Sequence, residues 1–171
     1  MYKRQVGATE NLILAACLAK GTTTIKNCAI EPEIKDLTNF LKTAGAKIKT
    51  TNNTIQIKGP KKIRSLDYLK TGEYPNFPTD LQAQIMVLLT RANGTSTIEE
   101  NIFENRFMHV SELKRLGAKI NIKGNRAIIE GTNNLEGAEL MSSDLRASVA
   151  LVLAAFISRG TSIINLSLIH I

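Results

Sequence analysis

Internal repetition constrains this chain more than any other feature. The Gly-Thr turn and strand at 21–25 recur at 94–98 and again at 160–164, and the Gly-Ala-Lys-Ile of 45–48 recurs at 117–120. Each copy is too short to bury its own apolar face, so copies of such a unit must pack on one another. The sequence therefore predicts an α/β repeat protein with one partial domain: a unit at 1–59, a linker-like stretch at 60–76, a second unit at 77–137 and a truncated third at 138–171.

Local patterns give the order of elements within a unit: a helix, the Gly-Thr turn, a strand, a second helix, a Gly-Ala stop and a hairpin. Pro32 suits the first turn of a helix, and Gly45 and Gly117 suit left-handed C-terminal caps. The hairpins are expected from residue 47 to 58 and from 119 to 130. Helical spacing predicts two buried faces, Leu81, Ile85, Leu88 and Leu89 in one unit and Leu145, Val149, Val152 and Leu153 in the next.

Composition narrows the classes of partner. The 171 residues carry a net charge of +7, but Lys and Arg are scattered without interleaved aromatics, which argues against nucleic acid and fits phosphates or nucleotide sugars. No apolar run could span a bilayer, so no membrane partner is expected, and nothing at the N-terminus resembles a secretory signal. The two cysteines, Cys17 and Cys28, lack metal or disulfide spacing and suit buried thiols in the cytoplasm. No metal ligand set is predicted.

The helix starts of the repeats carry the candidate chemistry. We expect Thr79 to cap a helix whose Gln82 reaches back to it, which places Asp80 in the first turn. Asp144 and Arg146 repeat the layout of Asp80 and Gln82 in the third unit. Asp80 stands 14 residues before its Gly-Thr turn, and the same count in the first unit gives Gly7, where a ligand could approach the backbone closely. A single Asp in a first turn is usually only a dipole or capping residue.

The run at 103–109 combines apolar anchors with polar side chains that need partners. Ahead of the apolar spacing of Val110, Leu113 and Leu116, it predicts a ligand-contacting turn, with a solvated helix start as the equal alternative. If the units surround a shared centre, two carboxylates with Arg106 and Arg146 would offer a base and anion clamps. His109 and His170 are interpreted as incidental.

The stretches at 6–11, 31–34, 77–84, 103–109 and 143–148 resemble the UDP-N-acetylglucosamine enolpyruvyl transferases (1-carboxyvinyltransferases). The resemblance implies an inside-out α/β barrel of βαβαββ units, with two complete units and part of a third here. It implies transfer of the enolpyruvyl group of phosphoenolpyruvate to the 3′-hydroxyl of UDP-N-acetylglucosamine, the first committed step of peptidoglycan synthesis. Phosphoenolpyruvate would be a co-substrate, and no cofactor is implied.

The same resemblance implies roles for individual residues. Asp80 would contact the hydroxyl and act as base, with Asp144 as the second active-site carboxylate. Val6 and Gly7 would make backbone contacts to the nucleotide, and Ile102 would contact the nucleotide-sugar. Arg106 and Arg146 would be cations near the phosphate chemistry. These roles are expectations that the resemblance carries to matching positions.

Departures from the family pattern set a second expectation. A lysine-asparagine pair, a mobile cysteine loop, a whole unit between Lys58 and Tyr74, and an Arg-Gly-Tyr motif after Asn165 have no counterpart here. We therefore expect a fragment that is inactive alone, marginally stable, and completed by the missing domain of the same enzyme. A non-catalytic nucleotide-sugar-binding remnant and a 3-phosphoshikimate 1-carboxyvinyltransferase-like enzyme stay open as alternatives.

Overall fold

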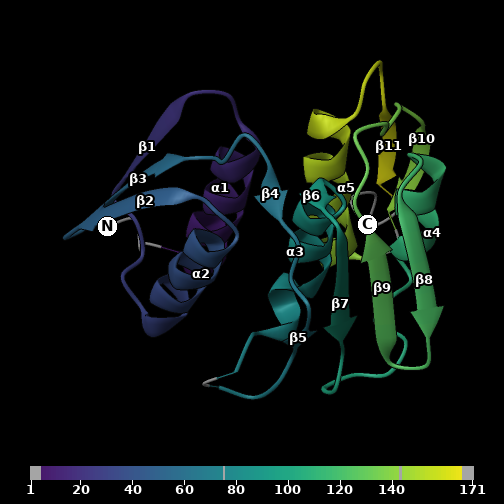
Figure 1. Cartoon of the computed structure of the whole chain (residues 1–171), viewed down its shortest axis with the longest axis horizontal. Helices are drawn as coiled ribbons and strands as arrows, with labels where there is room; N and C mark the ends of the chain where they lie inside the picture. The colour runs from purple at the N-terminus through teal and green to yellow at the C-terminus, as the bar shows by residue number, and fades with distance from the viewer. Residues whose placement is uncertain (1–4, 75, 143, 167–171) are drawn as a thin grey trace. The chain divides into compact units, whose positions relative to one another are not determined.

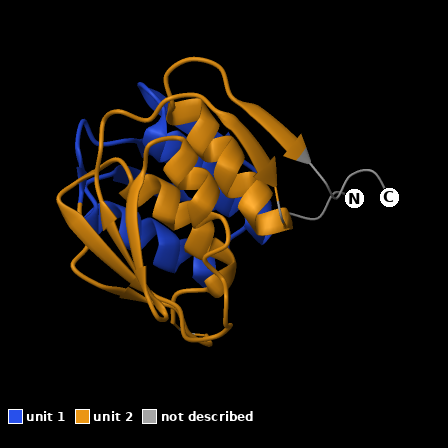
Figure 2. Cartoon of the chain, turned by 90° about the vertical axis from the view of Figure 1, so that its right-hand side faces the viewer, with its two compact units in different colours: residues 1–64 blue, residues 65–171 orange. Residues whose placement is uncertain are grey.

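The computed structural model describes residues 5–74, 76–142 and 144–166, and it divides into two compact units, 1–64 and 65–171 (Figure 2). The boundary between them falls inside the 60–76 stretch that the sequence marks as linker-like. Among the described helices, none has the length and apolar character that crossing a membrane requires.

Unit 1 is a small sheet covered by two helices (Figure 1). Helix α1 (Val6–Leu18) leads to β1 (Thr22–Lys26), and α2 (Pro32–Thr43) leads to the hairpin of β2 (Lys47–Thr51) and β3 (Thr54–Lys58); β4 (Ile63–Arg64) ends the unit. The antiparallel sheet has the order β1-β3-β2. Ile55 and Ile57 of β3 are buried together with Leu14 of α1 and Leu37 of α2, so the core lies between the sheet and the helices.

Unit 2 begins with a four-stranded sheet of order β5-β7-β9-β8. Its elements are β5 (Leu69–Lys70), the 3-10 turn η1 (Thr79–Leu81), α3 (Gln82–Leu89), β6 (Ala92–Asn93), β7 (Thr95–Glu99), α4 (Val110–Arg115), β8 (Lys119–Lys123) and β9 (Arg126–Glu130). Strand β5 pairs parallel to β7, and the remaining pairs are antiparallel. Apart from the two-residue strand β6, the elements from β5 to β9 therefore follow the order βαβαββ, and β5 comes from the linker-like stretch.

A further βαβ element completes unit 2. Strand β10 (Glu139–Ser142) pairs parallel to β11 (Ile163–Leu166), and α5 (Leu145–Ile157) connects them. Helix α5 packs on α3, all eight of whose residues are buried. Through this contact the starts of α3 and α5 come to the same region of unit 2. The described residues form open sheets and no closed barrel.

Several local predictions are confirmed. Lys47 pairs with Lys58 and Lys119 with Glu130, the registers that the two hairpin patterns require. Pro32 occupies the first turn of α2. Gly45 (φ +102°) and Gly117 (φ +91°) adopt the left-handed conformation that ends a helix. Val110, Leu113 and Leu116 are buried.

Two predictions about helix starts and faces are wrong. Thr79 does not cap a helix with Gln82, because its hydroxyl donates to Glu100 Oε2 (2.9 Å) and η1 precedes α3. The predicted buried face of α5 is incorrect in part: Leu153 is buried as predicted, but Leu145 is 77% exposed and Val152 39%. Helix α5 packs on α3, and its buried residues are Ala147, Ala150, Leu151, Leu153 and Ala154.

Candidate functional site

Two arginines from different segments meet one carboxylate in unit 2. Asp80 projects from η1, and its Oδ1 lies 2.6 Å from Arg146 Nε and 3.7 Å from Arg106 Nη1. Arg146 belongs to the first turn of α5, whereas Arg106 comes from the 103–109 turn. Among the described residues, both ion pairs use Oδ1 and none uses Oδ2. The arrangement fixes the orientation of the carboxylate and leaves Oδ2 to accept a hydrogen bond from a ligand.

Asp144 is the N-cap of α5. Its Oδ1 accepts from the backbone N–H of Arg146 (2.8 Å) and of Ala147 (3.0 Å). The sequence places Asp144 inside the first turn behind a capping serine, but Ser143 lies outside the described residues. The capping interaction holds the start of α5, and with it Arg146, in position beside Asp80. Asp144 therefore has a structural role here, whatever part it takes in the chemistry.

Glu100 joins the two segments of the site and is a residue that the sequence does not single out. It is 3% exposed and follows β7 directly. Its Oε1 accepts from the backbone N–H of Ile102 (2.9 Å) and Phe103 (3.3 Å), while Oε2 accepts from Thr79 (2.9 Å). One buried carboxylate thus ties the 103–109 turn to η1, which brings Arg106 to Asp80. The only signal for Glu100 in the sequence is the position of a glutamate directly after a predicted strand.

The 103–109 turn has the two-sided character that its sequence predicts. Phe107 is 9% exposed and anchors the turn, whereas Phe103 is 52% exposed. The Arg106 guanidinium lies 4.2 Å from the centre of the Phe103 ring, a cation–π contact that restrains both side chains. Asn105 adopts the left-handed backbone conformation (φ +57°), which asparagine tolerates better than most residues do. The turn therefore presents Arg106 in a fixed orientation.

Arg106 and Arg146 line a pocket of about 260 Å³ at this place. Asp144 and His109 belong to its wall, and the complete lining is Thr79, Gln82, Ala83, Glu104, Asn105, Arg106, Met108, His109, Asp144, Arg146 and Ala147. A second pocket, of about 500 Å³, shares Glu104, Asn105, Arg106 and Met108 with the first and reaches Asn125. The wall combines the guanidiniums of Arg106 and Arg146 with the carboxylates of Glu104 and Asp144, and the two guanidiniums can bind an anionic group of a ligand.

His109 is buried in the wall of this pocket and is 3% exposed. Burial lowers the pKa of its imidazole from 6.5 to about 4, against the opposing effects of the Asp144 charge and a hydrogen bond to the Arg106 backbone. The imidazole is therefore neutral near pH 7. The sequence interpretation of His109 as incidental did not include its burial in a pocket wall.

The residues predicted to contact the nucleotide and the nucleotide-sugar, Val6, Gly7 and Ile102, are not part of the lining of this pocket. Val6 and Gly7 form the first turn of α1 in unit 1, where no atom lies within 4 Å of a Cβ built on Gly7. The Gly7 backbone is thus open to close approach, although its carbonyl already accepts from Asn11 Nδ2 (2.8 Å). Ile102 belongs to unit 2, is partly exposed, and lies in the segment tied down by Glu100. These contacts stay predictions.

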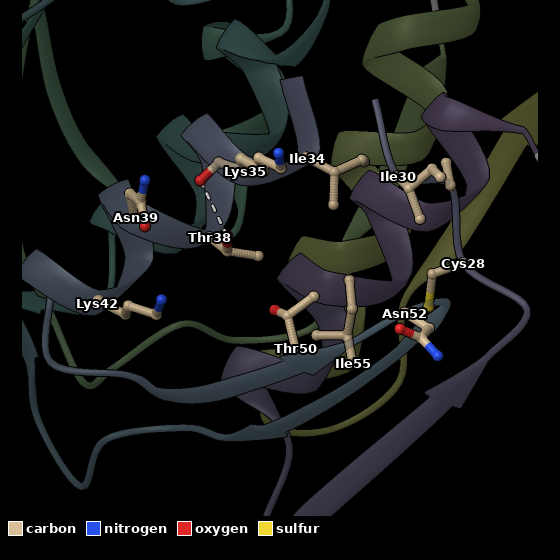
Figure 3. A pocket seen from close by; sticks show the side chains of 11 residues that line it. Cys28, Ile30, Ile34, Lys35, Thr38, Asn39, Lys42, Thr50, Asn52 and Ile55 are labelled. Carbon is tan, nitrogen blue, oxygen red and sulfur yellow. Dashed lines mark hydrogen bonds between the residues drawn. The ribbon is translucent and has the colours of Figure 1, made fainter. Parts of the chain in front are cut away.

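Unit 1 has a cavity of its own, which the sequence did not indicate (Figure 3). It measures about 260 Å³ and lies between α2 and the β2–β3 hairpin. Ile30, Ile34 and Ile55 supply apolar surface, and Lys35 and Lys42 lie along the helical side. Among the described residues, none of the buried unpaired polar atoms belongs to this lining.

A family model described as EPSP synthase (3-phosphoshikimate 1-carboxyvinyltransferase) matches residues 3–73 and 68–170. The chain belongs to this family. A UDP-N-acetylglucosamine 1-carboxyvinyltransferase of Pelagibacter ubique is 46% identical, over 95% of the chain and 55% of that protein. The protein of the same name from Thermodesulfovibrio yellowstonii is 39% identical, over 94% of the chain and 55% of its own length. The resemblance stated above is confirmed, and the chain spans about half the length of these relatives.

Solved structures agree on the fold. The enolpyruvyl transferase NikO from Streptomyces tendae superposes with a TM-score of 0.81 at 22% identity, covering 94% of the chain and 38% of that structure. EPSP synthase from Acinetobacter baumannii gives a TM-score of 0.75 at 14% identity, covering 96% and 39%. At these identities the likeness concerns the fold alone, and it shows the α/β architecture of enolpyruvyl transferases.

The matches also reveal an internal discontinuity. The alignment to the Pelagibacter ubique protein extends over 230 positions, although this chain has 171 residues. The excess is about the length of one repeat unit. The family model matches in two pieces that overlap at residues 68–73. A stretch of the relatives therefore has no counterpart here, which agrees with the whole unit expected to be missing between Lys58 and Tyr74.

Proposed function

We propose that this chain is part of an enzyme that transfers the enolpyruvyl group of phosphoenolpyruvate to the 3′-hydroxyl of UDP-N-acetylglucosamine, in the cytoplasm. One observation carries the proposal. Asp80, Arg106 and Arg146 meet beside a pocket, in a chain that is 46% identical to the UDP-N-acetylglucosamine 1-carboxyvinyltransferase of Pelagibacter ubique. A carboxylate oriented by two guanidiniums can accept a hydroxyl proton while the same cations attract a phosphorylated co-substrate.

In the proposed reaction Asp80 takes part in proton transfer, and Arg106 and Arg146 bind the phosphate. Asp80 Oδ2 accepts the proton of the 3′-hydroxyl as that oxygen forms a bond to C2 of phosphoenolpyruvate, and C3 takes up a proton from solvent water to become a methyl group. Loss of a C3 proton to solvent water and departure of phosphate from C2 then restore the double bond. Arg106 and Arg146 balance the charge of the phosphate as it leaves. Asp144 keeps Arg146 in place through the α5 cap.

The finer architecture is part of the proposal. We infer an inside-out barrel of βαβαββ units, to which this chain contributes two units and part of a third. An exposed apolar stripe on α5 supports it: Leu145 is 77% exposed, Val152 39% and Phe156 80%. Such a stripe on a helix whose other side is buried requires a partner element. The partner would be the missing domain of the same enzyme.

Binding measurements on the 171-residue chain test the proposal. By calorimetry we expect phosphoenolpyruvate to bind in the presence of UDP-N-acetylglucosamine, and Arg146→Gln to weaken binding of phosphoenolpyruvate about ten-fold, because a charge-assisted contact is lost. Arg115→Gln is the matched control, since Arg115 pairs with Glu112 and does not line the pocket. Equal binding by wild type and Arg146→Gln would contradict the role of the site.

The family description itself supports a second candidate, a 3-phosphoshikimate 1-carboxyvinyltransferase. Binding of shikimate 3-phosphate in place of the nucleotide-sugar would establish it. Phosphate release from phosphoenolpyruvate tests the expectation that the chain is inactive alone. Turnover that disappears in Asp80→Asn would refute the expected inactivity and confirm the catalytic role of Asp80.

A further inference from the structure

The pocket lined by Arg106 and Arg146 contains buried polar atoms that make no hydrogen bond in the free protein. Among the described residues, Gln82 Nε2, Arg106 Nη1 and His109 Nε2 each lack a hydrogen bond, and all three residues line this one pocket. An unpaired buried polar atom is unfavourable, so folded proteins rarely retain one without a use. Arg106 already has a role in the proposed function, but Gln82 and His109 do not.

The hydrogen-bonding state of His109 follows from its surroundings. One ring nitrogen donates to the backbone carbonyl of Arg106, and because Nε2 has no partner, this nitrogen is Nδ1. The neutral imidazole then carries its proton on Nδ1, and Nε2 has a lone pair only. His109 therefore requires a hydrogen-bond donor from whatever occupies the pocket.

Gln82 has the opposite requirement. It is the first residue of α3 and is 1% exposed. Its amide nitrogen carries two N–H donors, so it requires an acceptor. An ionised phosphate or carboxylate could satisfy Gln82 and the guanidiniums, but it has no proton for His109 Nε2. A neutral group that both donates and accepts, such as a hydroxyl or a secondary amide, satisfies both residues.

We propose that His109 and Gln82 bind a neutral hydroxyl or acetamido group of the sugar, and so contribute to substrate specificity beside the anion-binding arginines. The identity of the ligand rests on the proposed function, whereas the requirement for a donor and an acceptor rests on the two side chains. In this arrangement the sugar N–H or O–H donates to His109 Nε2, and an oxygen of the sugar accepts from Gln82 Nε2.

The test compares UDP-N-acetylglucosamine, UDP-glucose and UDP by calorimetry. We expect His109→Phe and Gln82→Met each to weaken binding of the nucleotide-sugar about ten-fold, the effect of one lost hydrogen bond, and to leave binding of UDP unchanged. His109→Gln retains an acceptor at a similar reach and should recover most of the affinity. Ser111→Ala is the matched control, because Ser111 is exposed, donates to Met108 O and does not line the pocket.

Thermal melts separate a ligand-binding role from a structural one. His109→Phe removes an unpaired acceptor from the interior but also the donor to the Arg106 carbonyl; these two changes oppose each other, so its melting temperature should stay close to that of wild type. Loss confined to UDP-N-acetylglucosamine identifies the acetamido group, and equal loss for UDP-glucose identifies a hydroxyl; both support the proposal.

Three results would overturn the inference. The first is an unchanged affinity of His109→Phe for the nucleotide-sugar. The second is a lowered melting temperature with parallel loss of UDP binding, which would make His109 structural. The third is a wild-type chain that binds UDP-N-acetylglucosamine no more tightly than UDP, a result that leaves nucleotide recognition intact. Failure of wild type to bind any of the three would instead refute the proposed function, and the inference with it.

Discussion

Acidification tests the buried state of His109 directly. In the unfolded chain its pKa is near 6.5, whereas burial lowers it to about 4 in the folded protein. Between these values the unfolded state binds more protons, so the free energy of unfolding falls as the pH falls. The difference in proton binding amounts to about 2 kcal/mol of lost stability between pH 7.5 and pH 5. That is a large share of the stability of a small domain.

Urea unfolding followed by circular dichroism at the two pH values measures this loss. His109→Phe should show almost none of it, because the variant has no group there to protonate. Glu99 does not interfere, since hydrogen bonds from Asn101, Tyr68 and Arg126 lower its pKa to about 2 and keep it ionised in this window. Proton NMR titration of the His109 ring is the second readout. If wild type and variant lost equal stability, or if the ring titrated near 6.5, the buried neutral imidazole would be refuted.

Three further predictions concern stability and reactivity. Asp144→Ala should lower the free energy of unfolding by about 1 kcal/mol, because two cap hydrogen bonds of α5 are lost, and Asp144→Ser should recover most of it in the same melts. Gly131→Ala should prevent stable folding, since its Cβ would lie 1.6 Å from the Ala92 carbonyl oxygen, whereas Gly7→Ala should fold normally; a soluble, cooperatively melting Gly131→Ala would count against the close approach. Burial raises the pKa of Cys17 to about 12, so this thiol should resist a disulfide reagent at pH 8 until urea is added.

Local patterns in the sequence predicted the hairpins and caps because their determinants are local. Alternation of apolar residues and a two-residue turn fix the register of β8 and β9, and no distant contact is needed. The buried face of α5 could not be predicted in this way. The spacing of large apolar residues placed Leu145 and Val152 on the interior face, whereas α5, which packs on α3, buries Ala150, Leu151 and Leu153.

The site was predicted in part. Spacing between repeats placed Asp80 and Arg146 at equivalent helix starts, and in the structure both Arg146 and Arg106 pair with Asp80. Glu100 was not predicted, because its partner Thr79 is 21 residues away and the hydrogen bond between them is a tertiary contact. His109 was considered incidental for a similar reason: its significance lies in its burial and an unpaired nitrogen, and neither can be read from a single histidine in a sequence.

Repetition explains how one pocket can combine charged and neutral recognition. Asp80 and Asp144 occupy equivalent positions in the repeats. Asp80 lies in a 3-10 turn and pairs with two arginines, whereas Asp144 caps α5. Two residues further on, one copy has Gln82 and the other Arg146, and both line the same pocket. Because the α3–α5 contact brings the two helix starts together, a single substitution in either copy changes one wall and leaves the other intact. Divergence of the copies can therefore produce a site with an anion-binding side and a neutral side without a new backbone.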